Sequence, residues 1–214
     1  MSTVLDEIEQ ALADDIRCWF PRVLAAEGYH ERFARDWSPL PHDRRSLVYH
    51  ARLAWTAAAF AAHAPEHRDA FAAYALHGIR FIDGPLRDHT HGGFFFDVAT
   101  DGRPLRDGEK HVVAIAFTIF AAARTFAVSG DPRARAVARD GLEWLERHCH
   151  CGDDPGYVEE LRRDGSPMGI PPPARRRGLL AILPPRRQRN PIGRPYGGQT
   201  ANTHLHVLEA FAEL

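Results

Sequence analysis

Polar residues near the C-terminus form the group best suited to chemistry. The segment 202–211 has the apolar content of a packed helix, yet it carries an asparagine, two histidines and a glutamate. At about 100° per residue, Asn202, His206 and Glu209 fall on one helix face. His204 falls on the opposite face with the apolar residues. Because buried polar groups are costly unless they are paired or border a cavity, the spacing predicts a pocket face with His206 at its centre.

Each of the two histidines has a structural and a functional interpretation. A histidine can donate, accept or transfer a proton near neutral pH, but a single histidine in a helix is more often a satisfied structural residue. We favour the structural interpretation for His204. For His206, which has polar neighbours along the same face, both interpretations remain open.

A second candidate group lies in an apolar segment near residue 50. Tyr49, Arg52 and Trp55 recur at three-residue steps and therefore share a helix face. An arginine inside an apolar helix needs an anionic or polar partner. Its guanidinium could bind a carboxylate or stabilise an oxygen that becomes negative during a reaction, and an interhelix salt bridge is the structural alternative. Trp55 is either a core residue or a surface on which a sugar stacks.

The chain that carries these groups contains a threefold repeat. Gly28, Gly93 and Gly156 are each followed by an aromatic residue, by an Asp eight positions later and by a Pro eleven positions later. The residue five positions after each glycine is apolar. The copies follow one another at intervals of 65 and 63 residues. This punctuation, with Asp-Gly-x-Pro in the second and third copies, predicts a small β-hairpin or extended loop in each.

Helical spacing precedes and follows every copy. We expect amphipathic helices before the copies, at about 5–26, 66–82 and 131–149, and more apolar helices after them, at about 44–63, at about 110–128 and from about 200. Such alternation predicts an all-α array of three helix-hairpin-helix repeats in a single domain, 1–214. The third inner helix is delayed by an inserted Pro- and Arg-rich loop, 171–194, which we interpret as solvated, with anion or partner binding as the alternative. Because the last residues lie inside a predicted inner helix, we expect an incomplete toroid.

Composition excludes several classes of function. A formal net charge of -1 gives no footprint for nucleic acid or an anionic membrane surface. The apolar run Val112 to Ala123 is too short to span a bilayer. The N-terminal segment is acidic and amphipathic and shows no secretory signal, so we expect the cytoplasm.

The run His148-Cys149-His150-Cys151 has the side chains of a metal site. Residues this close in sequence do not easily converge on one tetrahedral ion without ligands from elsewhere, and no second cluster is visible. We therefore expect polar residues at a helix end rather than a metal site.

Three segments resemble one known family. They are 49–55 (YHARLAW), the Gly92-Gly93-Phe94-Phe95 turn with Asp101-Gly102 and, above all, 202–210 (NTHLHVLEA). From about Trp19 to Leu214 the chain resembles the N-acylglucosamine 2-epimerase superfamily, which includes cellobiose 2-epimerases and mannose isomerases. The resemblance implies an (α/α)6 barrel without an essential metal or other cofactor. It also implies epimerisation or isomerisation at C2 of a reducing sugar, by proton transfer through a cis-enediolate.

The resemblance also implies roles for particular residues. Arg52 matches the arginine that stabilises the enediolate oxygen, and His206 matches a histidine that contacts the substrate near its reducing end, with Asn202 beside it. Tyr49, Trp55 and Glu209 complete the expected substrate-binding set. The proton-transferring histidine pair of the family lies in the second half of the barrel, so we expect this chain alone to be inactive. The alternative is a non-catalytic carbohydrate-binding or scaffold remnant, and the oligomeric state is left open.

Overall fold

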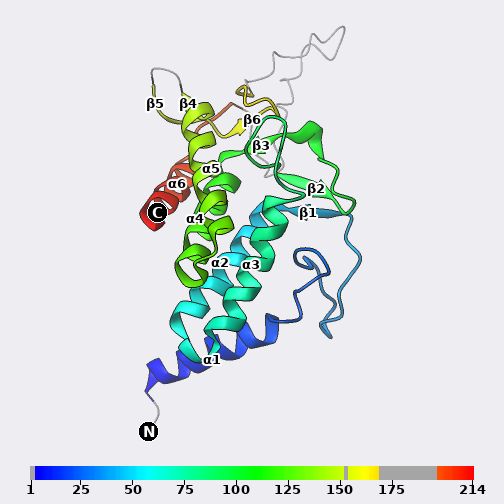
Figure 1. Ribbon diagram of the computed structural model, residues 1–214, viewed down its shortest axis with the longest axis vertical. Helices are drawn as coiled ribbons and strands as arrows, with labels where there is room; N and C mark the ends of the chain where they lie inside the picture. The colour runs from blue at the N-terminus through cyan, green and yellow to red at the C-terminus, as the bar shows by residue number, and fades with distance from the viewer. Residues whose placement is uncertain (1–2, 152–153, 169–196) are drawn as a thin grey trace, which may run out of the picture.

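A computed structural model describes residues 3–151, 154–168 and 197–214 (Figure 1). Three inner helices lie side by side in the order α2 (Leu47–His63), α4 (Val112–Ser129) and α6 (Ala201–Glu213). Outer helices α3 (Arg68–Asp83) and α5 (Pro132–His148) pack on them, α3 against α2 and α4, and α5 against α4. The predicted alternation of inner and outer helices is therefore confirmed.

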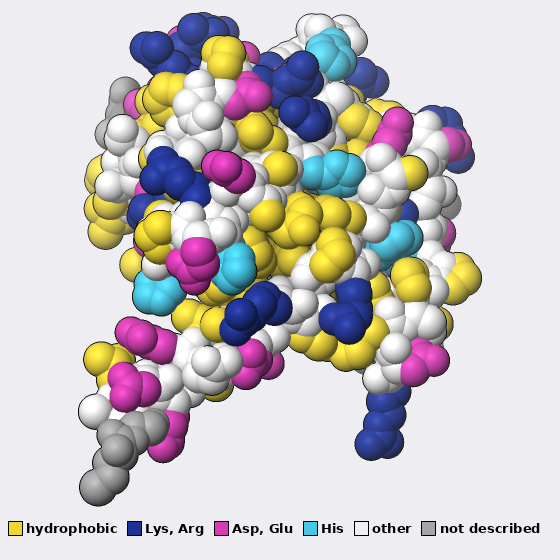
Figure 2. Space-filling view, turned by 60° about the horizontal axis from the view of Figure 1, so that its bottom comes forward, with side chains coloured by type: hydrophobic (Ala, Val, Ile, Leu, Met, Phe, Trp, Pro, Cys, Tyr) yellow, Lys and Arg dark blue, Asp and Glu magenta, His cyan; other side chains and the backbone are white. Residues whose placement is uncertain are grey.

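Helix α1 (Val4–Trp19) is shorter than the predicted 5–26. It ends before Pro21, whose nitrogen cannot donate a backbone hydrogen bond. The apolar spacing continues beyond this point because Phe20 and Val23 are buried in the turn that follows. Only Ile16 of α1 is buried, and the helix extends from the body with acidic side chains along it, at the lower left of Figure 2.

Short polar side chains fix where most of the other helices begin. Each accepts a hydrogen bond from a backbone N–H in the first turn, which would otherwise have no partner. These capping residues are Ser46 for α2, Asp131 for α5 and Thr200 for α6. Pro132 follows Asp131 at the first helical position, where an N–H would have no partner within the helix.

Helix α4 has the length and hydropathy that a membrane-spanning helix needs, but 61% of it is buried inside the structure. Its neighbours on several sides are α2, α3, α5 and α6. This burial identifies α4 as the central core helix, in agreement with the apolar inner helix that the sequence predicts at about 110–128.

The three copies of the repeat form three β-hairpins of the same geometry, which we call the first (28–39), second (93–104) and third (156–167) hairpin. In each, the apolar residue five positions after the glycine bridges the proline eleven positions after it, in the pairs Phe33 with Pro39, Val98 with Pro104 and Leu161 with Pro167. The Asp carboxylate accepts from the N–H two residues later in every copy. The next residue after each Asp has a positive φ: 66° at Trp37, 82° at Gly102 and 86° at Gly165.

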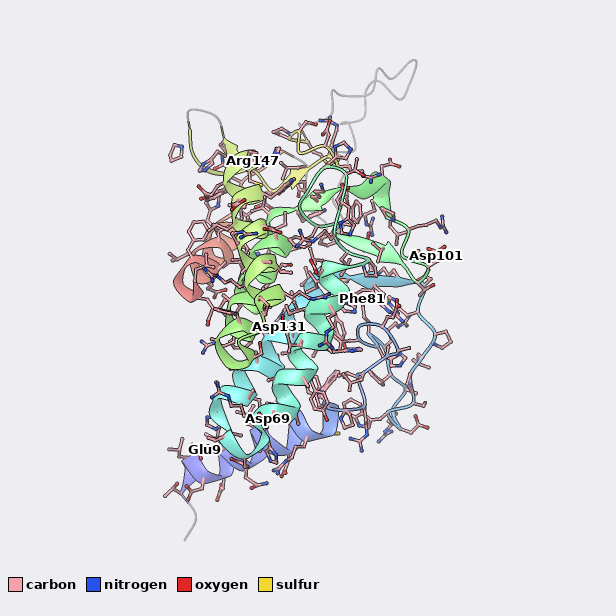
Figure 3. All side chains as sticks on the ribbon, viewed as in Figure 1. Glu9, Asp69, Phe81, Asp101, Asp131 and Arg147 are labelled. Carbon is pink, nitrogen blue, oxygen red and sulfur yellow. The ribbon has the colours of Figure 1, made fainter. Side chains whose placement is uncertain are left out.

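Strand pairing links each of the first two inner helices to the hairpin of the next repeat. Strand β1 (Arg44–Ser46), just before α2, pairs antiparallel with β2 (Asp97–Ala99) of the second hairpin. Likewise β3 (Lys110–His111), just before α4, pairs with β6 (Glu160–Leu161) of the third hairpin. A further pair, β4 (His150–Cys151) with β5 (Asp154–Tyr157), follows α5. In Figure 3, α3 begins near the bottom beside Asp69 and α5 ends near the top beside Arg147. Both outer helices therefore run toward the side of the molecule that carries the paired strands.

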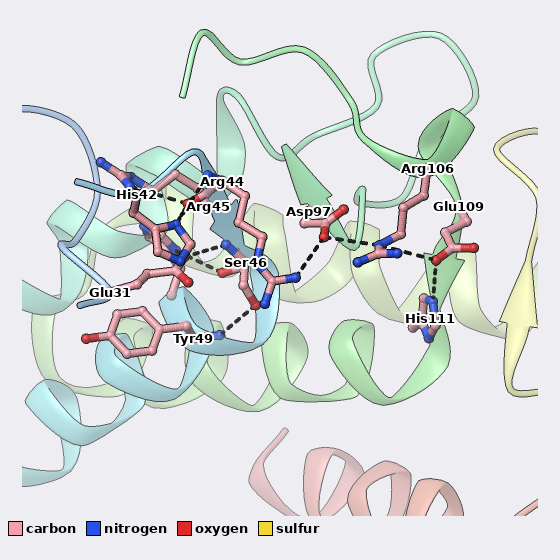
Figure 4. A network of polar contacts seen from close by, with 11 residues as sticks. Glu31, His42, Arg44, Arg45, Ser46, Tyr49, Asp97, Arg106, Glu109 and His111 are labelled. Carbon is pink, nitrogen blue, oxygen red and sulfur yellow. Dashed lines mark hydrogen bonds and ion pairs between the residues drawn. The ribbon is translucent and has the colours of Figure 1, made fainter. Parts of the chain in front are cut away.

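A chain of ion pairs joins the first two inner helices at their N-terminal ends (Figure 4). Buried Asp97 accepts from Arg44 at 3.3 Å and from Arg106 at 3.2 Å. Arg106 also lies 3.8 Å from Glu109, which in turn lies 3.2 Å from the imidazole of His111. The network holds β1, β2 and the start of α4 in one register.

A buried ion pair fixes the third hairpin. The Nζ of Lys110 lies 3.1 Å from Asp88, both side chains being fully buried. Arg163 of the third hairpin donates twice to the same carboxylate. Burial by itself raises the pKa of Asp88, but the hydrogen bonds from Arg163 and Lys110 outweigh it and lower the pKa to about 2.

Candidate functional site between the inner helices

A pocket of about 430 Å³ opens between the inner helices, near their N-terminal ends. Its walls come from all three inner helices and from Phe96, which precedes β2. The residues from α2, α4 and α6 are Val48, Ala51, Arg52, Trp55, Thr56, Val113, Phe117, Phe120, Asn202, His206 and Glu209. Five of the six predicted site residues are among them, all except Tyr49, so the pocket joins segments about 150 residues apart.

The pocket residues occupy equivalent positions in the three repeats. The second, sixth and ninth residues of each inner helix line the pocket. The second positions are Val48, Val113 and Asn202; the sixth are Arg52, Phe117 and His206; the ninth are Trp55, Phe120 and Glu209. The three helices therefore present the same face to a common centre, with different chemistry from each repeat.

Arg52 and His206 meet at the ring of Phe117. The guanidinium carbon of Arg52 lies 5.5 Å from the centre of this ring, and the His206 imidazole lies 4.4 Å from it. In the part of the chain that the structure describes, no ion pair or hydrogen bond engages the Arg52 guanidinium. The interhelix salt bridge considered for Arg52 is thus not formed among these residues. The arginine is exposed to the pocket and can receive an anionic oxygen.

Glu209 forms a hydrogen bond with His206. The Nδ1 of His206 lies 2.8 Å from Oε2 of Glu209, one turn further along α6. The His206 side chain is 21% exposed, so it is partly covered but open to the pocket. Asn202 lies one turn before His206 on the same wall, as the helical spacing predicts.

Trp55 lies at the pocket with one ring face occupied. It stacks on Phe120 at 5.0 Å with an interplanar angle of 16°. Its indole Nε1 is buried and has no hydrogen-bond partner in the described residues. Trp55 therefore contributes its remaining ring face to the pocket wall.

The structure does not bring Tyr49 to this pocket. Its hydroxyl donates to the backbone carbonyl of His30 in the first hairpin at 2.9 Å. Burial raises the pKa of this hydroxyl to about 12. The expectation that Tyr49 shares the ligand face with Arg52 is corrected, because Tyr49 points to the preceding hairpin.

His204 is a structural residue, as favoured from the sequence. Its Nε2 accepts from the backbone N–H of Tyr157 at 3.0 Å, and its Nδ1 donates to the carbonyl of Thr200 at 2.8 Å. His50 makes the same two contacts in the first repeat, to Tyr29 and Ser46. Each of these histidines fastens a hairpin to the inner helix that follows it.

The side chains of the 148–151 run do not converge on one point. His148 packs on the Trp144 ring, His150 lies 3.1 Å from Glu146, Cys151 accepts from Gln199 and Cys149 is buried. Within the described ranges, no group of three or more histidine, cysteine or acidic side chains is arranged to hold a metal ion.

Sequence reasoning missed the contribution of α4. This helix is almost entirely apolar and none of its residues is a candidate from the sequence, yet Phe117 and Phe120 form the middle wall of the pocket. Counting from the start of each inner helix would have found them, because they fall at the same positions as Arg52 and Trp55.

An inner row of apolar helices backed by outer helices, with hairpins and a pocket at one end, is the architecture of an α/α toroid, present here in part. The chain belongs to the N-acylglucosamine 2-epimerase (GlcNAc 2-epimerase) family, whose model matches residues 28–172. This family assignment agrees with the resemblance of the sequence motifs.

Individual relatives are about twice as long as the chain. A cellobiose 2-epimerase of Bacteroides fragilis is 26% identical over 198 residues, which are 92% of this chain and 45% of that protein. The solved cellobiose 2-epimerase of Spirochaeta thermophila has a TM-score of 0.76 and 27% identity, covering 98% of this chain and 48% of that one. A D-mannose isomerase structure shares the fold, with a TM-score of 0.73 and 21% identity over 100% of this chain and 49% of its own. The chain thus spans about half the length of these relatives.

Proposed function

We propose that this chain is part of an enzyme that epimerises or isomerises a reducing sugar at C2. The observation that carries the proposal is the single pocket that Arg52, Asn202 and His206 share, with an arginine that has no anionic partner among the described residues. Cellobiose 2-epimerases among the relatives support a sugar as substrate. An assay against a panel of sugars determines which sugar reacts and whether the reaction is epimerisation or isomerisation.

The chemistry follows from the charges at the pocket. A base removes the proton from C2, and the electron pair moves onto the carbonyl oxygen to give a cis-enediolate. The Arg52 guanidinium stabilises that negative oxygen. This interaction is stronger in the transition state than in the ground state, so it lowers the barrier. Return of a proton to the other face of C2 gives the epimer, whereas its return to C1, with transfer of the O2 proton to O1, gives the ketose isomer. Asn202 and His206 hold the sugar by hydrogen bonds, and the proton-transferring pair belongs to residues outside this chain.

Two exposed apolar surfaces support the view that further repeats complete the ring. On α1, Val4, Leu5 and Ile8 are more than half exposed, although their spacing is that of a packed face. On α6, Leu205 and Leu208 are exposed on the side away from α4. Contiguous exposed apolar residues on helices mark surfaces that other elements cover. The cytoplasmic location, and the absence of nucleic-acid and membrane partners, stay predictions of the sequence.

The test is an assay of the full-length protein that contains this chain. We expect it to interconvert at least one pair of C2 epimers, or an aldose and its ketose, from a panel of cellobiose, glucose, mannose, fructose and N-acetylglucosamine. We expect the 214-residue chain alone to be inactive. Sugar binding without turnover of any of these substrates would favour the non-catalytic remnant instead.

Arg52→Lys separates charge from shape. We expect kcat to fall by about 10²-fold, because lysine keeps the charge but lacks the planar fork of donors. The matched control is Arg103→Lys, since Arg103 lies outside the pocket and pairs with Asp101 at the exposed tip of the second hairpin. Undiminished turnover by Arg52→Lys would remove this residue from the mechanism.

A further inference from the structure

The hydrogen bond between His206 and Glu209 decides which imidazole nitrogen carries the proton. Nδ1 of His206 and Oε2 of Glu209 are 2.8 Å apart. A carboxylate accepts hydrogen bonds and does not donate them, so Nδ1 must carry the proton. In the neutral imidazole the lone pair then resides on Nε2.

Nε2 of His206 is the nitrogen left for a ligand. No hydrogen bond to it is made by the residues that the structure describes, whereas the corresponding Nε2 atoms of His50 and His204 are both occupied by backbone N–H groups. His206 lines the pocket and packs against Phe117 with ring centres 4.4 Å apart, which restricts rotation of the imidazole. Glu209 and Phe117 therefore fix the proton and the orientation of the ring, respectively.

We propose that Glu209 is a positioning residue, which holds His206 as the Nδ1-protonated tautomer and presents a basic Nε2 to the sugar. This inference rests on the proposed function and revises the expectation that Glu209 binds substrate directly. A sugar hydroxyl then donates to Nε2. Without Glu209 the imidazole favours the Nε2–H tautomer of free histidine, and it offers the sugar a donor where an acceptor is needed.

The first measurement is independent of turnover. Histidine side chains are labelled with ¹⁵N in the full-length protein, and the His206 signals are identified by their loss in His206→Ala. The two ring nitrogens report directly which one is protonated. We expect Nδ1–H in the wild type at pH 7.5, and a shift to mainly Nε2–H in Glu209→Ala.

The second measurement is steady-state kinetics on the sugar that the full-length protein converts. We expect Glu209→Ala to lower kcat/KM by about tenfold or more, because the imidazole that holds the sugar then presents a donor instead of an acceptor. Glu209→Gln should restore part of kcat/KM, because its amide oxygen can still accept from Nδ1–H. The matched control is Glu213→Ala on the same helix, since Glu213 pairs with Arg124 at 2.7 Å and does not line the pocket. It should leave both the tautomer and kcat/KM unchanged.

Several results would overturn the inference. One is Nε2–H as the main tautomer in the wild type, and another is a Glu209→Ala variant that keeps both Nδ1–H and kcat/KM. A rise in KM with an unchanged tautomer would also overturn it, because Glu209 would then contact the sugar directly. If the proposed function is wrong, the wild-type protein converts no sugar. The ¹⁵N experiment does not depend on turnover, so it still tests the Glu209 contact in that case.

Discussion

Replacing His50 by leucine tests whether buried histidines fasten the hairpins to the inner helices. His50 is fully buried, and its Nε2 accepts from the N–H of Tyr29, itself buried, at 3.0 Å. Leucine is of similar size but accepts no hydrogen bond, so it leaves this N–H without a partner. A buried donor left unsatisfied costs about 1–3 kcal/mol, and the Ser46 carbonyl loses its donor as well. We expect the free energy of unfolding at pH 7.5 to fall by about 3 kcal/mol.

The same substitution should change how stability depends on pH. Burial outweighs the hydrogen bond to Ser46 and lowers the pKa of His50 from 6.5 to about 3. The folded state therefore binds the proton more weakly than the unfolded state. The contribution of His50 is complete above pH 6.5 and is lost progressively as the pH falls toward 3. At pH 4.5 the wild type loses about 3 kcal/mol through this residue, since each pH unit below 6.5 weakens the folded state by roughly 1.4 kcal/mol. Leucine has no such loss, so the two proteins should be nearly equally stable there.

Urea unfolding followed by tryptophan fluorescence at pH 7.5 and pH 4.5 measures both differences. His204→Leu is the matched comparison, because His204 makes the same contacts at a partly exposed site where water can replace the lost acceptor. It should lose less stability at pH 7.5. A His50→Leu variant as stable as the wild type at pH 7.5, or one whose deficit is the same at both pH values, would contradict the reasoning.

Two other stability predictions follow from the hairpins. Trp37 has a φ of 66° where the other hairpins have glycine. The free energy of unfolding of Trp37→Gly should therefore be about 1 kcal/mol higher than that of Trp37→Ala, whereas alanine is usually the more stable of the two. Urea unfolding of both variants measures the difference. Asp88→Asn should lower stability at neutral pH by about 2 kcal/mol, since the pKa of Asp88 is depressed from 3.8 to about 2. That contribution is present above pH 4 and lost as the pH falls to 2, so denaturation curves of the two proteins should converge in acid.

The hairpins were predictable because their residue types are dictated by local backbone geometry. A positive φ is best tolerated by glycine, and an Asp before it accepts from the N–H two residues later. Both rules operate within a few residues, so the repeat in sequence became the same turn three times. The end of α1 was missed because Phe20 and Val23 keep helical spacing while packing in a turn.

The pocket face was predictable only in part. An inner helix is in contact with neighbours on more than one side, and its own sequence does not say which side borders the pocket and which side packs on a hairpin. Arg52 and Trp55 point to the pocket, but Tyr49, within 60° of Arg52 by helical spacing, bonds to the first hairpin. That choice is made by the first hairpin, which packs on α2 from outside the helix's own sequence.

The sixth position of the inner helices shows how one fold position acquires chemistry. The backbone places Arg52, Phe117 and His206 equivalently, so any of the three repeats could have supplied the charged group. The middle helix, α4, has neighbours on several sides and is the most deeply buried of the three, and it carries phenylalanine. The arginine and histidine occur on the two flanking helices, where partial exposure makes a charge or a polar ring less costly. Phe117 then serves as the common surface against which both polar side chains are held, 5.5 Å and 4.4 Å from its ring. An apolar residue at the centre is therefore as much a part of this site as the residues that carry its chemistry.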